Sequence, residues 1–185
     1  MRFVPLKVEG AYKVELNPNR DHRGFFVRTY DESLFAKQGL VTEWLQDSQS
    51  FSSQKGTVRG LHIQSAPYNE TKLVRVVTGR IFMGFIDLRP YSPTFKKTDH
   101  VVLSSEVLEL LYVPKGLAMG MCTLSDNATL LYKIDTPYNS ESARTILWND
   151  PDINIPWPVK EASVISDRDK NAPRLKDLLA KEKLV

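Results

Sequence analysis

The sequence predicts a mainly β protein, built as an antiparallel sandwich or barrel with short flanking helices. Its apolar runs are short and rich in β-branched and aromatic residues, and Gly, Pro, Asn, Asp or Ser bounds each of them. Turn signals recur at close spacing, which is typical of all-β architectures. The sequence lacks the alternation of strands with long helices that a parallel α/β fold requires.

The predicted strands begin near the N-terminus and continue to about residue 150. A short helix is expected at residues 31–40, where Asp31 is suited to the N-cap and Gly39 to the C-terminal end. The Thr78-Gly79 pair predicts a hairpin turn. Strands are expected within residues 11–16, 24–30, 42–47, 57–64, 72–88, 99–105, 108–114, 118–124, 128–138 and 144–150.

The last part of the chain has a different character. Residues 150–173 are rich in proline and lack periodicity, so an irregular segment is expected there. Pro173 then precedes Leu175, Leu178 and Leu179, which recur at helical spacing. A short amphipathic helix is therefore predicted, packed on the β body or on a partner chain.

Size and composition suit one soluble domain over residues 1–185, with 42% hydrophobic residues. The net charge of +3 is small and evenly spread, so no nucleic-acid partner is expected. No stretch approaches the roughly 20 apolar residues of a membrane span. The single cysteine, Cys122, excludes an internal disulfide and is expected to be buried. These features predict a cytoplasmic protein.

Residues 57–64, which read TVRGLHIQ, carry the most informative polar side chains. Strand alternation places Gly60, His62 and Gln64 on one face, so Arg59 joins them only if the strand bulges at Gly60. Inside a barrel, His62 would be a candidate base, and the nearby Lys72 would be a cation for developing negative charge.

The same residues also have purely structural interpretations. Tyr132 and Tyr138 are ordinary strand residues, Arg59 suits a solvated sheet edge, and Asp169 suits a turn. A metal site is disfavoured, because Gln64 stands where a His-x-His pair would need its second histidine. The other histidines, His22 and His100, lie in polar segments. No phosphate-binding loop, dinucleotide fingerprint or nucleophile elbow occurs.

A series of motifs runs in order across nearly the whole chain: DHRGFFVRTY, LQDSQS, VRGLHIQ, KLVRVVTGRIF, DLRPYSPTF, YVPKGLAMGM, LSDNATLLYK, ILWNDPDINIPWP and ISDRDKNAP. In this order they resemble the dTDP-4-dehydrorhamnose 3,5-epimerase family of nucleotide-sugar epimerases. The resemblance implies a cupin-type antiparallel β-barrel, or jelly roll, and an isomerase of nucleotide-diphospho-4-keto-6-deoxyhexoses in deoxysugar and surface-polysaccharide biosynthesis. It further implies a homodimer, with neither cofactor nor metal.

The resemblance also implies roles for individual residues. His62 matches the general base, Asp169 its carboxylate partner, Tyr132 the general acid and Lys72 the cation beside the ketone oxygen. The implied substrate-binding residues are Arg23 and Arg59 at the diphosphate, Gln46 and Asp47 in a nucleotide-binding segment, Tyr138 stacked on the nucleobase, and Met119 and Arg168.

Several positions depart from the family pattern. Met119 stands where members often carry a histidine, and Arg28, Met83 and Ala143 stand where members often carry acids; Ser48 replaces an asparagine. These departures predict conserved chemistry on a different substrate: a CDP- or GDP-linked sugar, a 3-deoxy sugar, or epimerisation at carbon 5 only. A cupin that binds a nucleotide sugar without catalysis and a sugar ketoisomerase remain as alternatives.

Overall fold

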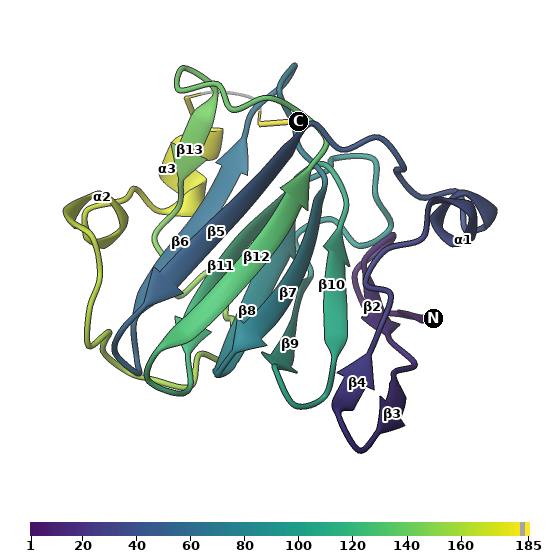
Figure 1. Cartoon of the computed structure of the whole chain (residues 1–185). Coiled ribbons are helices and arrows are strands. Elements are labelled where there is room, and N and C mark those ends of the chain that lie inside the picture. Colours follow the sequence, from purple (N-terminus) through teal and green to yellow (C-terminus); the bar gives the residue numbers. More distant parts are fainter. Residues whose placement is uncertain (182–183) are drawn as a thin grey trace.

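The computed structural model describes residues 1–181 and 184–185, and its strands form two antiparallel sheets that face each other (Figure 1). This confirms the mainly β, antiparallel architecture. The first sheet holds β1 (Arg2–Pro5), β2 (Tyr12–Glu15), β10 (Glu109–Val113), β7 (Lys72–Thr78), β12 (Ala128–Ile134) and β5 (Gln46–Ser52), in this order. The second holds β13 (Ala143–Thr145), β6 (Val58–Gln64), β11 (Leu117–Thr123), β8 (Arg80–Asp87) and β9 (Thr98–Ser104). A separate hairpin holds β3 (Asn19–Asp21) and β4 (Gly24–Phe26).

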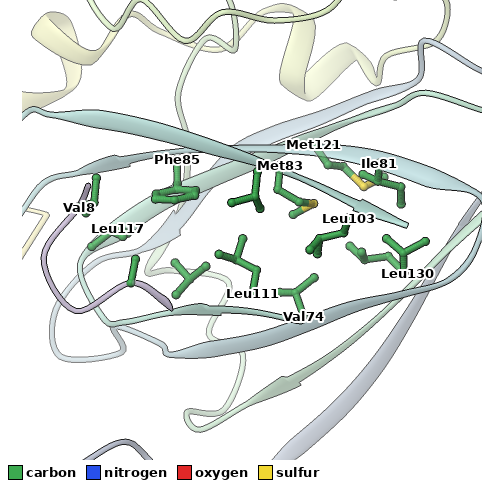
Figure 2. Packing of buried hydrophobic residues seen from close by; sticks show 14 of the residues in the cluster. Val8, Val74, Ile81, Met83, Phe85, Leu103, Leu111, Leu117, Met121 and Leu130 are labelled. Atoms are coloured by element: carbon green, nitrogen blue, oxygen red, sulfur yellow. The ribbon is translucent and has the colours of Figure 1, made fainter. Parts of the chain in front are cut away.

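The main core lies between the two sheets, as Figure 2 shows. Strand alternation explains it: Ile81, Met83 and Phe85 of β8 point into this core, whereas Phe82 and Ile86 pack on the outer face. The outer face of the second sheet is covered by residues of the proline-rich segment and the C-terminus. A third cluster, around Phe35, covers the outer face of the first sheet.

The predicted helix near residue 31 is confirmed as α1 (Glu32–Lys37). The Asp31 side chain accepts a hydrogen bond from the Leu34 N–H, which satisfies one free donor at the helix start. Gly39 follows the helix with φ of +68°, the left-handed conformation that commonly ends helices. The side chain of Phe35 is thereby fixed on the sheet, fully buried.

The predicted C-terminal helix is confirmed as α3 (Leu175–Leu179), with Leu175 and Leu178 buried against the second sheet; residues 182–183 of the expected run lie outside the described residues. A further helix, α2 (Asp167–Lys170), lies in the segment predicted to be irregular. Ser166 caps it by accepting a hydrogen bond from the Asp169 N–H. No helix of residues 1–181 and 184–185 has the length and apolar character needed to cross a bilayer.

Two sequence predictions about strands are wrong. The turn at Thr78-Gly79 does not close a hairpin, because β7 and β8 belong to different sheets and face each other through their side chains. The strand expected at residues 42–47 instead spans Gln46–Ser52. Its serines alternate along an edge strand beside β12, so backbone pairing, rather than apolar burial, holds it in the sheet.

Cys122 is fully buried, as expected, and burial raises the pKa of its thiol to about 11.

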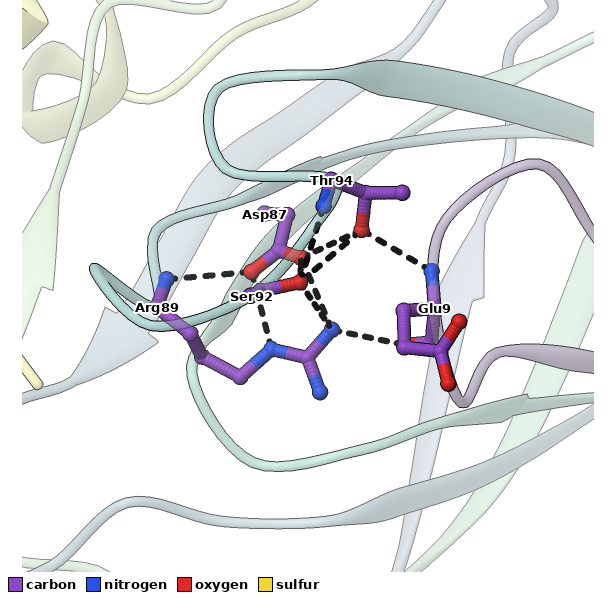
Figure 3. A network of polar contacts seen from close by, with 5 residues as sticks. All are labelled: Glu9, Asp87, Arg89, Ser92 and Thr94. Carbon is purple, nitrogen blue, oxygen red and sulfur yellow. Dashed lines mark hydrogen bonds and ion pairs between the residues drawn. The ribbon is translucent and has the colours of Figure 1, made fainter.

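A buried polar network ties the end of β8 to the N-terminal segment (Figure 3). Asp87 is fully buried and accepts hydrogen bonds from the Arg89 guanidinium at 2.8 Å, from Thr94 at 2.7 Å and from Ser92 at 2.5 Å. The Arg89 guanidinium also donates a hydrogen bond to the backbone carbonyl of Glu9. The Thr94 hydroxyl oxygen accepts one from the Glu9 N–H. Burial acts to raise the pKa of Asp87, but these donors outweigh it and lower the pKa to about 2.

We expect Asp87→Asn to lower the free energy of unfolding at pH 7 by about 2 kcal/mol, because the pKa of the native carboxyl lies below its ordinary value of 3.8. The contribution is complete above pH 3.8 and is lost as the pH falls through about 2. Urea denaturation at pH 7 and pH 3 measures it. Asp21→Asn is the matched control, since the Asp21–Arg23 pair is exposed and should contribute little. Equal stability of wild type and Asp87→Asn at pH 7 would contradict the prediction.

Candidate active site

A cavity of about 380 Å³ opens between the two sheets, and it brings together six of the residues singled out from the sequence. Arg59 and His62 of β6, Met83 of β8 and Met119 of β11 line it from the second sheet. Lys72 of β7 and Tyr132 of β12 line it from the first sheet. His62 and Tyr132 therefore lie on opposite walls, so a ligand between the sheets would present one face to each.

A bulge in β6 places Arg59 and His62 in the same cavity. Met121 pairs with Arg59 and Met119 pairs with His62, so two residues of β6 oppose the single Gly120 of β11. This confirms the bulge that the sequence predicted at Gly60. Gly60 has φ of +108°, and a Cβ atom there would lie 2.7 Å from the Gly120 Cα. Only glycine fits this backbone, which is why the strand contains one.

Asp169 holds the His62 ring from behind the cavity. Its Oδ1 lies 2.7 Å from the His62 Nε2, and its Oδ2 accepts a hydrogen bond from the Gly60 N–H at 3.0 Å. Burial acts to raise the pKa of Asp169, but the hydrogen bonds from His62 and Gly60 outweigh it and hold this pKa below its ordinary value. An ionised Asp169 directs the Nε2–H of neutral His62 toward itself, which leaves the Nδ1 lone pair as the basic site.

The cation of the cavity is held by an acidic neighbour. The Lys72 Nζ lies 2.7 Å from the Glu70 Oε1, and both side chains are largely buried, at 13% and 11% exposed. The ammonium has three N–H donors, so pairing with Glu70 leaves others for a ligand oxygen. Base, cation and phenol therefore surround one small volume.

A second cavity of about 420 Å³ shares Arg59 and His62 with the first. Arg168 and Asp169 of α2 line it, and the Arg168 Nε donates to the Thr145 Oγ1 at 2.7 Å. The Arg59 guanidinium donates to the backbone carbonyl of Phe51 at 3.0 Å. Two guanidinium groups therefore flank the histidine, which suits a substrate that carries phosphates.

Some predicted residues lie outside these cavities. Asp47 points to the outer face of the first sheet, where its carboxylate pairs with the Lys133 Nζ at 3.0 Å. Arg23 lies on the β3–β4 hairpin and pairs with Asp21. This hairpin projects from the body at the end opposite to β6 and α2 (Figure 1). The structure therefore does not bring Asp47 or Arg23 to His62 within one chain.

Tyr138 and Gln46 meet beside the site instead. The exposed Tyr138 follows β12, and its backbone N–H donates to the Gln46 Oε1 at 3.0 Å. The tyrosine ring is thus free to accept a flat partner, while the hydrogen bond fixes its backbone.

Several residues that the structure places at the site are not among those predicted from the sequence. Glu70 is one of them, although it stands two residues before Lys72 and thus on the same side of an extended chain. Gln49 and Ser50 of β5 also line the cavity, and strand alternation in the run QDSQSFS could have indicated Ser50, which shares a face with Ser48 and Ser52. Met121, for which no site role was predicted from the sequence, lines the same cavity together with Met83.

The donors present do not resemble a metal site. In the part of the chain that the structure describes, no group of three or more His, Cys, Asp or Glu side chains is placed to hold a metal ion. The arrangement instead suits proton transfer: a base oriented by a carboxylate, a cation, and a phenol on the opposite wall.

Comparisons with known proteins agree with this chemistry. The family model described as dTDP-4-dehydrorhamnose 3,5-epimerase matches residues 5–177. A dTDP-4-dehydrorhamnose 3,5-epimerase of Shigella flexneri is 43% identical over 158 residues, covering 85% of this chain and 86% of that protein. Among solved structures, a dTDP-6-deoxy-D-glucose-3,5-epimerase of Legionella pneumophila in complex with dTDP-4-keto-L-rhamnose is 34% identical, with a TM-score of 0.91 and coverage of 97% and 95%. A 3'-monoepimerase of Streptomyces bikiniensis in complex with dTDP-quinovose is 31% identical, with a TM-score of 0.89 and coverage of 97% and 91%. The chain therefore belongs to the dTDP-4-dehydrorhamnose 3,5-epimerase family.

Proposed function

We propose that the protein epimerises a nucleotide-diphospho-4-keto-6-deoxyhexose, with dTDP-linked 4-keto-6-deoxyglucose as the first candidate substrate. The observation that carries this proposal is the placement of His62 and Tyr132 on opposite walls of one cavity, with Lys72 beside them. Inversion of a carbon atom needs proton removal from one face and proton return from the other, and this cavity offers a group for each.

The proposed reaction begins at a carbon next to the 4-ketone. The Nδ1 of His62 removes the proton, the C–H electron pair forms a carbon–carbon double bond, and the carbonyl electrons move to oxygen. The ammonium of Lys72 stabilises the resulting enolate oxygen. Asp169 stabilises the imidazolium that forms. These steps move only protons, so the proposed reaction uses no redox cofactor.

Tyr132 completes the reaction from the opposite wall. Its phenol donates a proton to the same carbon, the carbonyl re-forms, and the configuration is inverted. Proton exchange with solvent then restores Tyr132 and His62. A ketone activates both neighbouring carbons, so the same groups serve carbon 3 and carbon 5.

The nucleotide end of the substrate is assigned to the rim of the site. Arg59 and Arg168 suit the diphosphate, because guanidinium groups bind phosphate oxygens in pairs. The exposed ring of Tyr138, with its backbone held by Gln46, suits stacking on the nucleobase. We assign no contact to Asp47 within one chain, because it faces away from the cavity.

Solvent deuterium incorporation tests this function. The protein is incubated in heavy water with dTDP- and CDP-linked 4-keto-6-deoxyglucose, and the sugar is analysed by mass and proton NMR. We expect deuterium at carbon 3, carbon 5 or both, with inverted product. Binding without deuterium entry would show a sugar-binding protein, and a moved carbonyl would show a ketoisomerase; either result rejects the proposal.

A second candidate, an epimerase of a less hydroxylated sugar that acts at carbon 5 only, is favoured by a methionine wall. This wall consists of Met83, Met119 and Met121, three of the four methionines of the chain, and all three line the cavity. Met119 pairs with His62 and Met121 pairs with Arg59 across the sheet. Thioether groups are poor partners for hydroxyls, so the sugar edge against this wall is better matched by carbon–hydrogen groups. A CDP-linked 3,6-dideoxy-4-ketohexose is the corresponding substrate.

The methionine wall is tested by the catalytic efficiency of the enzyme toward two sugars, 4-keto-6-deoxyglucose and its 3-deoxy analogue, each linked to dTDP and to CDP. A buried hydroxyl without a partner costs about 1–3 kcal/mol, so a preference of about 5- to 150-fold for the deoxy analogue is expected. Met119→Gln should reduce that preference, and Leu131→Met, on the other face of its sheet, should not. Efficient inversion of the fully hydroxylated dTDP sugar at both carbons would reject this candidate.

We further propose that the two facing sheets are those of a cupin-type jelly roll.

We also propose that the chain acts as a homodimer. Phe25 and Phe26 are 51% and 69% exposed on the projecting β3–β4 hairpin, which suits contact with a second copy. The same hairpin carries Arg23, whose predicted role at the diphosphate requires another copy's cavity. Ultracentrifugation should give twice the mass of one chain. Mixing Arg23→Ala with His62→Gln chains should then restore activity; a monomer would reject the proposal.

A further inference from the structure

Behind the catalytic lysine lies a hydrogen-bonded chain of side chains that the mechanism above does not use. Glu70 holds the Lys72 ammonium through its Oε1 at 2.7 Å. Its other oxygen, Oε2, accepts a hydrogen bond from the Gln64 Nε2 at 3.2 Å. Each oxygen of the carboxylate therefore has a different donor, so the orientation of the carboxylate is fixed from both sides.

Gln64 is the centre of this chain. It is the last residue of β6, two residues after His62, and its side chain is almost fully buried, at 2% exposed. Besides Glu70, its Nε2 contacts the backbone carbonyls of Tyr68 at 3.0 Å and Pro137 at 3.2 Å, and its Oε1 accepts a hydrogen bond from the Asn139 N–H at 2.6 Å. Gln64 thereby holds the backbone on both sides of Tyr138.

The connection spans the two ends of the proposed substrate. Lys72 serves the ketone oxygen of the sugar, and Tyr138 serves the nucleobase. Between them, Glu70 and Gln64 form an unbroken set of contacts, each with a donor–acceptor distance of 3.2 Å or less. A lysine side chain has several rotatable bonds and is mobile unless held. The buried network supplies that restraint, because each member is fixed by another.

We propose that Glu70 and Gln64 are positioning residues of the epimerisation, which rests on the function proposed above. Glu70 fixes one N–H of the Lys72 ammonium, so that the remaining donors point at the ketone oxygen. Gln64 fixes Glu70 and the Tyr138 segment relative to each other, so that the nucleotide and the cation keep a constant separation. Neither residue touches the reacting carbon.

The two residues are expected to affect different steps. Glu70→Gln keeps the shape of the side chain, but the amide has only one acceptor oxygen for two donors. We expect kcat to fall by about 10- to 100-fold, as for the loss of a hydrogen bond to a charged group, with KM and dTDP affinity within about twofold of wild type. Gln64→Met keeps the volume and removes all the hydrogen bonds. It should lower kcat and also weaken dTDP binding by about 5- to 50-fold.

A double-mutant cycle separates positioning from a general effect on the fold. If Glu70 acts only through the lysine, Lys72→Met and the Lys72→Met/Glu70→Gln double variant should have equal kcat. Glu161→Gln, which removes an exposed carboxylate, is the control and should behave as wild type. Thermal unfolding of each variant accompanies the kinetics, and restoration of most of kcat in Glu70→Asp would identify the carboxylate as the essential feature.

Three results would overturn the proposal: unchanged kcat in Glu70→Gln, an additional loss of kcat when Glu70→Gln is combined with Lys72→Met, or unchanged dTDP affinity in Gln64→Met. The affinity for dTDP is measured by isothermal titration calorimetry, which does not require the enzyme to turn over a sugar. A wild type that incorporates no deuterium into any sugar therefore rejects the proposed function, whereas the titration of Gln64→Met still decides whether Gln64 positions the nucleotide segment.

Discussion

His62→Gln should lower the rate of deuterium entry into the sugar by about 10²- to 10⁴-fold, the usual contribution of a positioned general base. Glutamine keeps a polar side chain of similar length, but it has no lone pair basic enough to accept the proton. The fold should persist, because His62 is only half-buried, at 41% side-chain exposure. Mass spectrometry of the sugar after timed incubation in heavy water measures the rate.

Two other variants accompany His62→Gln: one tests the return of the proton, and the other is a control. In Tyr132→Phe the proton can leave but cannot return from the opposite wall, so we expect deuterium exchange without inversion. His100→Gln is the matched histidine control: His100 is exposed on β9, stacked on Phe82 at 5.0 Å, and lies outside both cavities. Deuterium entry at the wild-type rate in His62→Gln would remove His62 from the mechanism, and inversion by Tyr132→Phe would remove Tyr132.

Most of the strands and the helices α1 and α3 could be predicted because local signals specify them, whereas β1 and β3 were not predicted and β5 was misplaced. Asp31 and Gly39 bracket α1, and the leucine spacing predicts α3. Which strands pair is set by contacts distant in sequence, so the turn at Gly79 was misread as a hairpin although β7 and β8 lie in different sheets. Local turn chemistry describes the bend and not the sheet that each strand joins.

The site divides in the same way. His62, Lys72 and Tyr132 were found from their residue types and from the family resemblance, and strand alternation with one bulge explains why they converge. The positioning roles proposed for Glu70 and Gln64 could not be predicted, because they depend on contacts between the end of β6, the residues before β7 and the segment after β12, and β6 and β7 belong to different sheets.

Gly60→Ala is expected to cost about 2–5 kcal/mol of folding free energy and to abolish epimerisation. An alanine at φ of +108° is strained by about 1–2 kcal/mol. Its Cβ would also lie 2.7 Å from the Gly120 Cα and 2.8 Å from the Met119 carbonyl oxygen, and overpacking of this kind adds about 1–3 kcal/mol. Both neighbours are backbone atoms, so the clash cannot be relieved by a side-chain rotation.

The matched control is Gly39→Ala, which has the same positive sign of φ, at +68°, but open space around the added Cβ. It measures the conformational strain alone, so urea denaturation of both variants isolates the contribution of the contact between β6 and β11.

Relief of the clash requires the bulge to flatten or the strands to separate. Either change moves the Gly60 N–H away from Asp169, and it turns Arg59 out of the cavity that it shares with His62. Loss of activity should therefore persist at temperatures where Gly60→Ala is still folded. Full activity in a folded Gly60→Ala would mean that the bulge does not assemble the site, and the placement of His62 and Arg59 in one cavity would then need another explanation.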